Sequence, residues 1–373
     1  MKPFSSGRVG GGYSWRARYR PYSRTRVSRI MRDEDVRPFT RRQIGLPRRG
    51  KLATVVLLAC ALASVGAATT VTTVGAAGSS HPKWTLAVVP KSVGLFYWGT
   101  VEAGAVAAGK ALNVKIVWKG TALETDVTGQ VNILQDFITE HVKGIVFAAT
   151  DAHALVATAT AAKAAGIPVV NVDSGLSPQV PPLVATQNVK AGAKAAEVLA
   201  KDIGYKGQVA LLPFVPSAAT SIQRQQGFEN QLKKYPNITL VAVQYDQSDI
   251  TIALSDMENI LTAHPGLKGV FAANEPGVIG VANALTERNM LGKVKVVGFD
   301  NAPDEIAALK AGKIQALIVQ NPYKMGYTAV SEVVSLIEHK KVPHDVDTGA
   351  VVATKANMNQ AAIHKLLYPP VKG

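Results

Sequence analysis

The residues best suited to chemistry in this sequence are carboxylates and amides at the ends of short apolar runs. They are Asp151 after residues 144–148, Asp173 after 168–172, Asn274 after 270–273, Asp300 after 297–299 and Gln320 after 317–319. Asp and Asn at such places often cap helices. In open parallel sheets, however, ligands bind outside the carboxyl ends of the strands. The whole set therefore predicts one shared cleft more readily than separate caps.

Aromatic residues and one arginine extend this polar set. Phe96-Tyr97-Trp98 follows the first apolar run, and three bulky rings in succession cannot all face the core. Beyond residue 51 the chain has two arginines. Arg288 stands at a helix end that suits a solvated role, whereas Arg224 begins a helix after a strand and offers five donors in a fixed geometry. The competing interpretations are that the aromatic rings are buried in the core and that Arg224 forms an ion pair at the surface.

Carboxylates, amides and an arginine beside aromatic rings are typical of a sugar site. The polar groups pair with hydroxyls, and a ring packs against the apolar C–H face of the sugar. Another small polyol would suit the same set. The chain has no G-x-x-x-x-G-K-S/T loop, no G-x-G-x-x-G after a strand and no G-x-S-x-G elbow, and its seven histidines lack metal-ligand spacing. We therefore expect neither an enzyme nor a metal or other cofactor.

From Trp84 onward, β-branched apolar runs alternate with Ala-rich segments at helical spacing, which indicates βαβ units and parallel sheets. The expected strands are residues 85–89, 114–118, 144–148, 168–172, 208–212, 239–244, 269–271, 294–298, 314–319 and 348–354. The expected helices are residues 101–112, 128–141, 154–165, 191–203, 221–234, 250–264, 277–289, 304–311 and 322–339, with a short helix after the last strand. Pro181 and Pro182 break the repeat near residues 180–188. We predict an α/β protein with two doubly wound parallel-sheet lobes.

The net charge of +15 resides mainly in the first part of the chain. Residues 1–51 hold 15 Lys and Arg against three acids, so the remainder is close to neutral. Binding by phosphate neutralisation needs a basic face on the folded domain. We therefore expect no nucleic-acid partner.

The first 78 residues have the layout of an export segment. Residues 1–50 lack apolar periodicity, which predicts disorder. Leu52–Ala68 is an uncharged apolar run with basic residues before it and small residues after it, as in a secretory signal. Its length is also at the short end for a spanning helix, so a cleaved signal peptide and a retained membrane anchor both stay open. Either interpretation places the protein outside the cytoplasm, in the periplasm or at the cell envelope. The single cysteine, Cys60, excludes an internal disulfide.

Five stretches in correct order resemble the ribose- and galactose-type periplasmic binding proteins, the substrate-capturing subunits of ABC importers. They are Pro168–Asp173, Arg224–Phe228, Val270–Glu275, Val296–Asp300 and Val319–Pro322, within a similar region that extends from about Lys83 to Ala353. The resemblance implies residues 83–187 with 321–347 as the N-terminal lobe, and residues 188–320 with 348–366 as the C-terminal lobe. It also implies three crossings near Gln187, Gln320 and Asp347, hinge closure on the ligand, and delivery to a membrane permease by a monomer.

The family's ligand positions fall on seven residues: Tyr97, Trp98, Asp173, Arg224, Asn274, Asp300 and Gln320. Two departures matter. Ser174 stands where the ribose-type pattern has Arg, and Leu95 and Ala148 stand at or near usual Asn positions. The first lobe should therefore offer fewer polar contacts than a ribose site, which leaves the sugar open. A membrane-anchored ligand sensor is the alternative function; a transcription regulator would need a helix-turn-helix, for which residues 1–50 lack the pattern.

Overall fold

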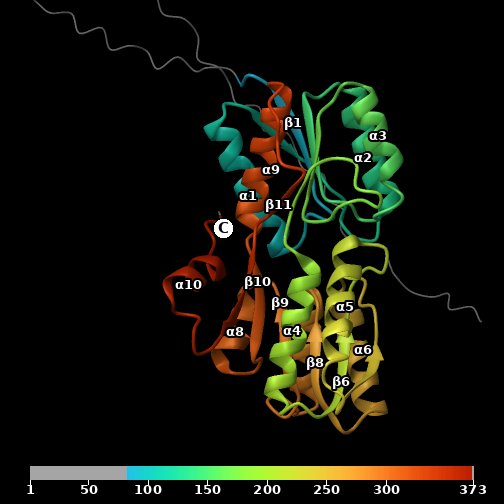
Figure 1. The fold of residues 1–373 in the computed structure, drawn as a ribbon, viewed down its shortest axis with the longest axis vertical. Coiled ribbons are helices and arrows are strands. Elements are labelled where there is room, and N and C mark those ends of the chain that lie inside the picture. Colours follow the sequence, from blue (N-terminus) through green and yellow to red (C-terminus); the bar gives the residue numbers. More distant parts are fainter. Residues whose placement is uncertain (1–81, 372–373) are drawn as a thin grey trace, which may run out of the picture. The chain divides into compact units, whose positions relative to one another are not determined.

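Residues 82–371 are described by a computed structural model, in which they form two α/β lobes (Figure 1). Their strands make two six-stranded sheets, and helices cover both faces of each sheet. The predicted fold class is confirmed. The leader and the export or anchor segment, Leu52–Ala68 included, lie outside the described residues. Within the described part, no helix has the length and apolar character needed to cross a bilayer.

The first lobe holds a sheet of strand order β11-β5-β4-β3-β1-β2, in which all paired strands are parallel. Its strands are β1 (Thr85–Val89), β2 (Lys115–Trp118), β3 (Gly144–Phe147), β4 (Val169–Val172), β5 (Leu183–Ala185) and β11 (Asp345–Asp347). One face packs against α1 (Phe96–Ala111) and α9 (Pro322–Ile337). The other face packs against α2 (Val127–Thr139) and α3 (Val156–Ala164).

The second lobe holds a sheet of strand order β12-β10-β9-β8-β6-β7. Its strands are β6 (Gly207–Leu212), β7 (Ile238–Val243), β8 (Leu267–Ala272), β9 (Lys295–Phe299), β10 (Ala316–Gln320) and β12 (Ala350–Thr354). The helices on one face are α4 (Asn188–Asp202) and α5 (Ala219–Leu232). Those in the cluster on the other face are α6 (Ile250–Ala263), α7 (Glu275–Glu287), α8 (Pro303–Ala311) and α10 (Ala361–Leu367).

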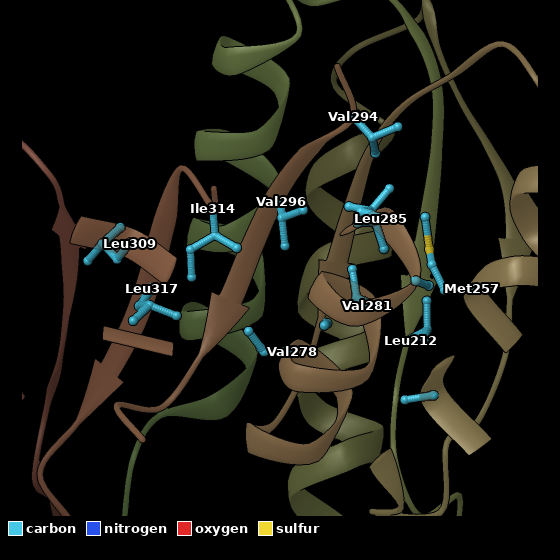
Figure 2. Packing of buried hydrophobic residues seen from close by; sticks show 14 of the residues in the cluster. Leu212, Met257, Val278, Val281, Leu285, Val294, Val296, Leu309, Ile314 and Leu317 are labelled. Carbon is cyan, nitrogen blue, oxygen red and sulfur yellow. The ribbon is translucent and has the colours of Figure 1, made fainter. Parts of the chain in front are cut away.

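The central strands, such as β3, β4 and β10, are buried on both faces of the sheet, as their continuous apolar runs predict, while the edge strands are half-buried. On α7, Val278, Val281 and Leu285 repeat at helical spacing and face the sheet. Figure 2 shows them in one cluster with Met257 of α6 and Leu212 of β6. Burial of each such side chain contributes about 1.5–3 kcal/mol. This packing holds rigid the strand ends on which the polar residues stand.

The chain crosses between the lobes three times. The crossings lie between β5 and α4, between β10 and α9, and between β11 and β12. The last is so short that β12 runs antiparallel to β10, which departs from the expectation of wholly parallel sheets. β11 runs parallel to the other strands of the first sheet and ends at the edge facing the second lobe. Because residues 348–349 alone follow before β12 begins, β12 enters the second sheet at the facing edge and runs against its neighbour.

The largest differences from the sequence-based expectation are two strands and the start of one helix. β5 and β11 have three residues each, too few for a recognisable period, and neither was predicted. α1 begins at Phe96 rather than at residue 101, so the three aromatic residues form its first turn. This shift decides where their side chains point.

Glycines allow the helices beside the second sheet to touch through their backbones. A Cβ on Gly192 of α4 would collide with the backbone carbonyl of Arg224 on α5, and one on Gly227 would collide with that of Val189. This close crossing places Arg224 against the first turn of α4.

We expect Gly192→Ala to lower the free energy of unfolding by about 1–3 kcal/mol, the usual cost of overpacking. Thermal melting of the variant measures this loss. Gly99→Ala on α1 is the matched control, because its Cβ would meet nothing within 4 Å. Equal melting temperatures for both variants would contradict the close contact.

Candidate functional site

A small cavity, with an open volume of about 20 Å³, lies where the strand ends of the two lobes meet. All seven residues predicted for the site line it. The full lining is Lys91, Leu95, Tyr97, Trp98, Glu124, Asp173, Phe214, Arg224, Asn274, Glu275, Pro276, Asp300 and Gln320. Two wider hollows beside the hinge strands, of about 490 and 400 Å³, have no such convergence of acids and arginine. The chemistry therefore concentrates in the cavity between the lobes.

Arg224 is buried and held in one orientation. Its Nε donates to Asn188 Oδ1 at 2.8 Å, and its Nη1 donates to the Ala273 carbonyl at 2.7 Å. The guanidinium lies 3.6 Å from the centroid of the Phe299 ring, a cation–π contact. These bonds fix the guanidinium plane while further donors face the cavity. The surface interpretation of Arg224 does not hold, because its exposed fraction is 3%.

Asp300 stands at the end of β9 with its carboxylate held on both oxygens. Gln320 Nε2 donates to Oδ1 at 2.7 Å, and the backbone N–H of Glu275 donates to Oδ2 at 3.3 Å. Burial raises the pKa of Asp300 to about 6, although Arg224 opposes the shift. Gln320 Oε1 is buried without a hydrogen-bond partner among the described residues, so it can accept a bond from a ligand.

Tyr97, Trp98 and Asp173 form the opposite wall. Tyr97 donates its hydroxyl to Asp173 Oδ1 at 2.7 Å, and burial raises the pKa of this phenol. The two aromatic rings pack edge to face with centroids 5.0 Å apart. Both rings belong to the core of the first lobe while also lining the cavity. The core and pocket interpretations of these aromatics are thus both correct.

Asp173 and Asp300 share an uncommon backbone conformation. Their φ angles are +60° and +85°, and each follows a buried strand, one in each lobe. A positive φ is costly for residues other than glycine, and such strain concentrates at functional sites. The two lobes therefore present an acid in the same unusual manner.

Sequence reasoning missed three charged residues of the lining. Lys91 Nζ lies 3.6 Å from both Glu124 Oε2 and Asp173 Oδ2, and it donates to Thr220 Oγ1 at 3.3 Å. Glu124 accepts from Trp98 Nε1 at 2.7 Å. Glu275 was recognised at a strand end but was left out of the site. Lys91 and Glu124 also follow the ends of strands β1 and β2, so the same strand-end criterion would have found them.

Lys91 changes the charge of the first lobe's wall. Its ammonium is 3% exposed and lies over the ring of Phe214 at 4.9 Å. Buried lysines need nearby anions or acceptors, and two carboxylates supply them here. Ser174, which stands where the ribose-type pattern has an arginine, has no hydrogen-bond partner for its buried hydroxyl in the described part of the chain. The first lobe thus offers a cation from β1 rather than from the fourth strand.

Two strand-end polar residues bond to the backbone of the turn or helix that follows them. Asp151 accepts from the backbone N–H groups of His153 and Ala154 and does not line the cavity. Asn274 lines the cavity and also caps α7. Its Oδ1 accepts from the backbone N–H of Gly277, and its Nδ2 donates to Ser248 Oγ at 3.0 Å. Arg288 pairs with Glu258 at the surface, as expected. Within residues 82–371, no group of three His, Cys, Asp or Glu side chains could hold a metal ion.

Residues of the two lobes also bind each other directly across the cavity. Glu275 accepts from the backbone N–H groups of Phe96 and Tyr97 at 3.2 and 3.0 Å. Glu124 Oε2 accepts from Ser248 Oγ at 2.8 Å. The structure is therefore that of a closed cleft.

Two α/β lobes that close over a small polar cavity define a receptor for a small molecule. Residues 86–341 match the family of the periplasmic binding protein domain, and the chain belongs to this family. It is 32% identical to the ribose import binding protein of Bacillus subtilis over 62% of this chain and 75% of that one. It is 31% identical to the D-allose-binding periplasmic protein of Escherichia coli, over 69% and 85% of the two chains.

Solved structures agree with this assignment. A carbohydrate transporter solute-binding protein from Agrobacterium radiobacter, in complex with D-arabinose, superposes with a TM-score of 0.75 at 36% identity. The alignment covers 76% of this chain and 99% of that protein. A transporter solute-binding protein from Agrobacterium vitis with bound D-fucose gives a TM-score of 0.74 at 34% identity, with 76% and 100% covered.

The pKa of Asp300 leads to a prediction about pH and stability. Because its pKa in the folded protein, about 6, exceeds the ordinary value of 3.8, stability is lost as the pH rises from about 4 through 6. Asn does not titrate, so Asp300→Asn should gain on the order of 2–3 kcal/mol over the wild type between pH 4 and pH 8. Melting temperatures of both proteins at the two pH values measure this change.

Asn283→Gln, at an exposed position of α7, is the control: neither side chain titrates, so its difference from the wild type should be the same at both pH values. If the difference in stability between Asp300→Asn and the wild type were the same at both pH values, the raised pKa of Asp300 would be contradicted.

Proposed function

We propose that this protein is the extracytoplasmic solute-binding subunit of a sugar-type ABC importer, which captures a monosaccharide or related polyol by closure of its lobes. One observation carries the proposal: acids, amides, an arginine and aromatic rings from both lobes converge on one cavity. Such a set pairs with the hydroxyls of a sugar and packs against its C–H face. The role is binding rather than catalysis, as it is for the relatives, which are named as binding proteins.

The ligand contacts that we propose divide between the lobes. In the first lobe, Asp173 accepts hydroxyl protons while Tyr97 and Trp98 give the apolar wall. In the second lobe, Arg224 and Asn274 donate, Asp300 accepts, and Gln320 accepts through its unpaired Oε1. Lys91, which lies beside Asp173, adds a donor for a hydroxyl or carbonyl oxygen.

The closed cavity is small and crowded. Its open volume of about 20 Å³ has room for about one water molecule. A ligand would therefore enter while the lobes are apart and displace lining side chains, which favours one sugar ring or a short polyol over an oligosaccharide. The relatives are named for ribose, D-allose and xylitol, and the structural neighbours hold D-arabinose and D-fucose. These pentoses, hexoses and a five-carbon polyol form the first set to test.

The transport cycle that we propose follows from the lobes and their three connections. Residues 83–187 with 321–347 and residues 188–320 with 348–366 would rotate about the crossings, so that the ligand contacts both lobes when they close. The exported protein would act as a monomer outside the cytoplasmic membrane and would deliver the closed, loaded form to an ABC permease.

A thermal-shift screen tests the ligand class. A molecule that binds the folded state alone raises the melting temperature with its concentration. We expect a shift with at least one aldopentose, aldohexose or pentitol and none with disaccharides. Shifts limited to amino acids or nucleosides would overturn the sugar assignment.

Arg224→Lys should weaken binding of the ligand found in that screen by tenfold or more, because a lysine keeps the charge but loses the fixed fork of donors. Titration calorimetry measures the Kd. Arg288→Lys is the matched control, since Arg288 lies at the surface of the same lobe. Unchanged affinity in Arg224→Lys would remove Arg224 from the site.

A further inference from the structure

The contact between Glu275 and α1 joins the two lobes directly. Glu275 is the first residue of α7 in the second lobe, and its two carboxyl oxygens accept from Phe96 N and Tyr97 N in the first lobe. The side chain is 7% exposed. Separation of the lobes would break both bonds, so this contact belongs to the closed state.

The N-terminus of α1 lacks a cap of its own. The first N–H groups of a helix have no partner within it and need acceptors or water. Leu95 holds the N-cap position of this 16-residue helix, and no side-chain cap bond is formed there. Glu275 supplies the missing acceptors from the opposite lobe, where the positive end of the helix dipole also favours a carboxylate.

We propose that Glu275 is a latch: by capping α1 across the cleft, its carboxyl favours the closed arrangement of the lobes before a ligand binds. Glu275 thus acts on the open–closed equilibrium and needs no contact with the ligand. The apparent affinity for any ligand of the closed form scales with the population of that form. The latch therefore sets affinity for all ligands alike.

The latch is also coupled to the binding site. The backbone N–H of Glu275 donates to Asp300 Oδ2, so a ligand-facing acid and the latch residue share a hydrogen bond. Asn274 and Pro276 flank Glu275 and fix the first turn of α7, the former by capping it. Glu275 therefore connects closure to the binding site: its carboxyl caps α1 of the first lobe, and its backbone N–H holds Asp300.

Protons should influence the latch. Burial raises the pKa of Glu275 to about 7, and the two backbone N–H bonds lessen the shift. The charged and titratable groups around it are Asp300, Glu305 and Arg224 of its own lobe, and Tyr97, Glu124, Asp173 and Lys91 of the other. In the open form the carboxyl meets water and returns toward its ordinary pKa. Closure therefore takes up a proton, and it weakens as the pH rises from about 4.5 through 7.

The test measures lobe separation in the ligand-free full chain. Spin labels at Gln135 on α2 and Ser255 on α6, both exposed, report the distance across the cleft after exhaustive dialysis, with Cys60 replaced by serine. Glu275→Ala removes both acceptors, so we expect the ratio of closed to open molecules to fall about tenfold, the effect of losing two ordinary hydrogen bonds. A distance distribution equal to that of the wild type would overturn the latch.

The Glu275→Gln variant keeps a hydrogen-bond acceptor for α1 but removes the titratable carboxyl. Its amide oxygen still accepts an N–H bond, so this variant should remain closed and should show a smaller change between pH 5 and pH 8 than the wild type, the remainder coming from Asp300. A change as large as that of the wild type would overturn the assignment of the proton to Glu275. Glu287→Ala, at the exposed far end of α7, is the matched control. Since no ligand is present, these outcomes are independent of the sugar assignment.

Discussion

The structure depends on keeping charged groups buried together in a closed cleft. The cavity holds four carboxylates, of Glu124, Asp173, Glu275 and Asp300, but two cations, Lys91 and Arg224. A buried charge without partners costs several kcal/mol, so each must be hydrogen-bonded or paired. Donors from both lobes supply these partners, so hydrogen bonds and ion pairs connect the two sides of the closed cleft.

This arrangement explains why the fold places the site where it does. The strands of both sheets end at the cavity, and the short connections after them carry the polar residues. Each lobe alone presents half of the partners. Burial of a ligand between the halves therefore requires closure, and the three crossings keep the halves joined while they move.

The balance of charges also limits what the cavity accepts. Hydroxyls can donate to the surplus carboxylates and accept from Arg224 and Lys91, so a neutral polyol satisfies both. An anionic ligand would add to the excess of carboxylates. The high pKa values of Asp300 and Glu275 express the same crowding, since burial disfavours their charged forms. Stability is thereby lowered at the residues that binding needs.

The sequence alone determined the two-lobed α/β architecture and the seven residues that now line one cavity. The architecture rests on a local rule, because apolar periodicity marks strands and helices. The seven residues rest on polar groups at strand ends together with the resemblance to a known family, since the strand-end rule by itself also selects Asp151, which does not line the cavity. Tertiary structure decided the rest. β5 and β11 are too short to carry a period, and β12 is antiparallel because its connection is short. Lys91, Glu124 and Glu275 bind partners in the other lobe that are 124 to 179 positions away: Thr220, Ser248 and Phe96. No local pattern encodes such pairs, because they exist when two separately folded lobes face each other.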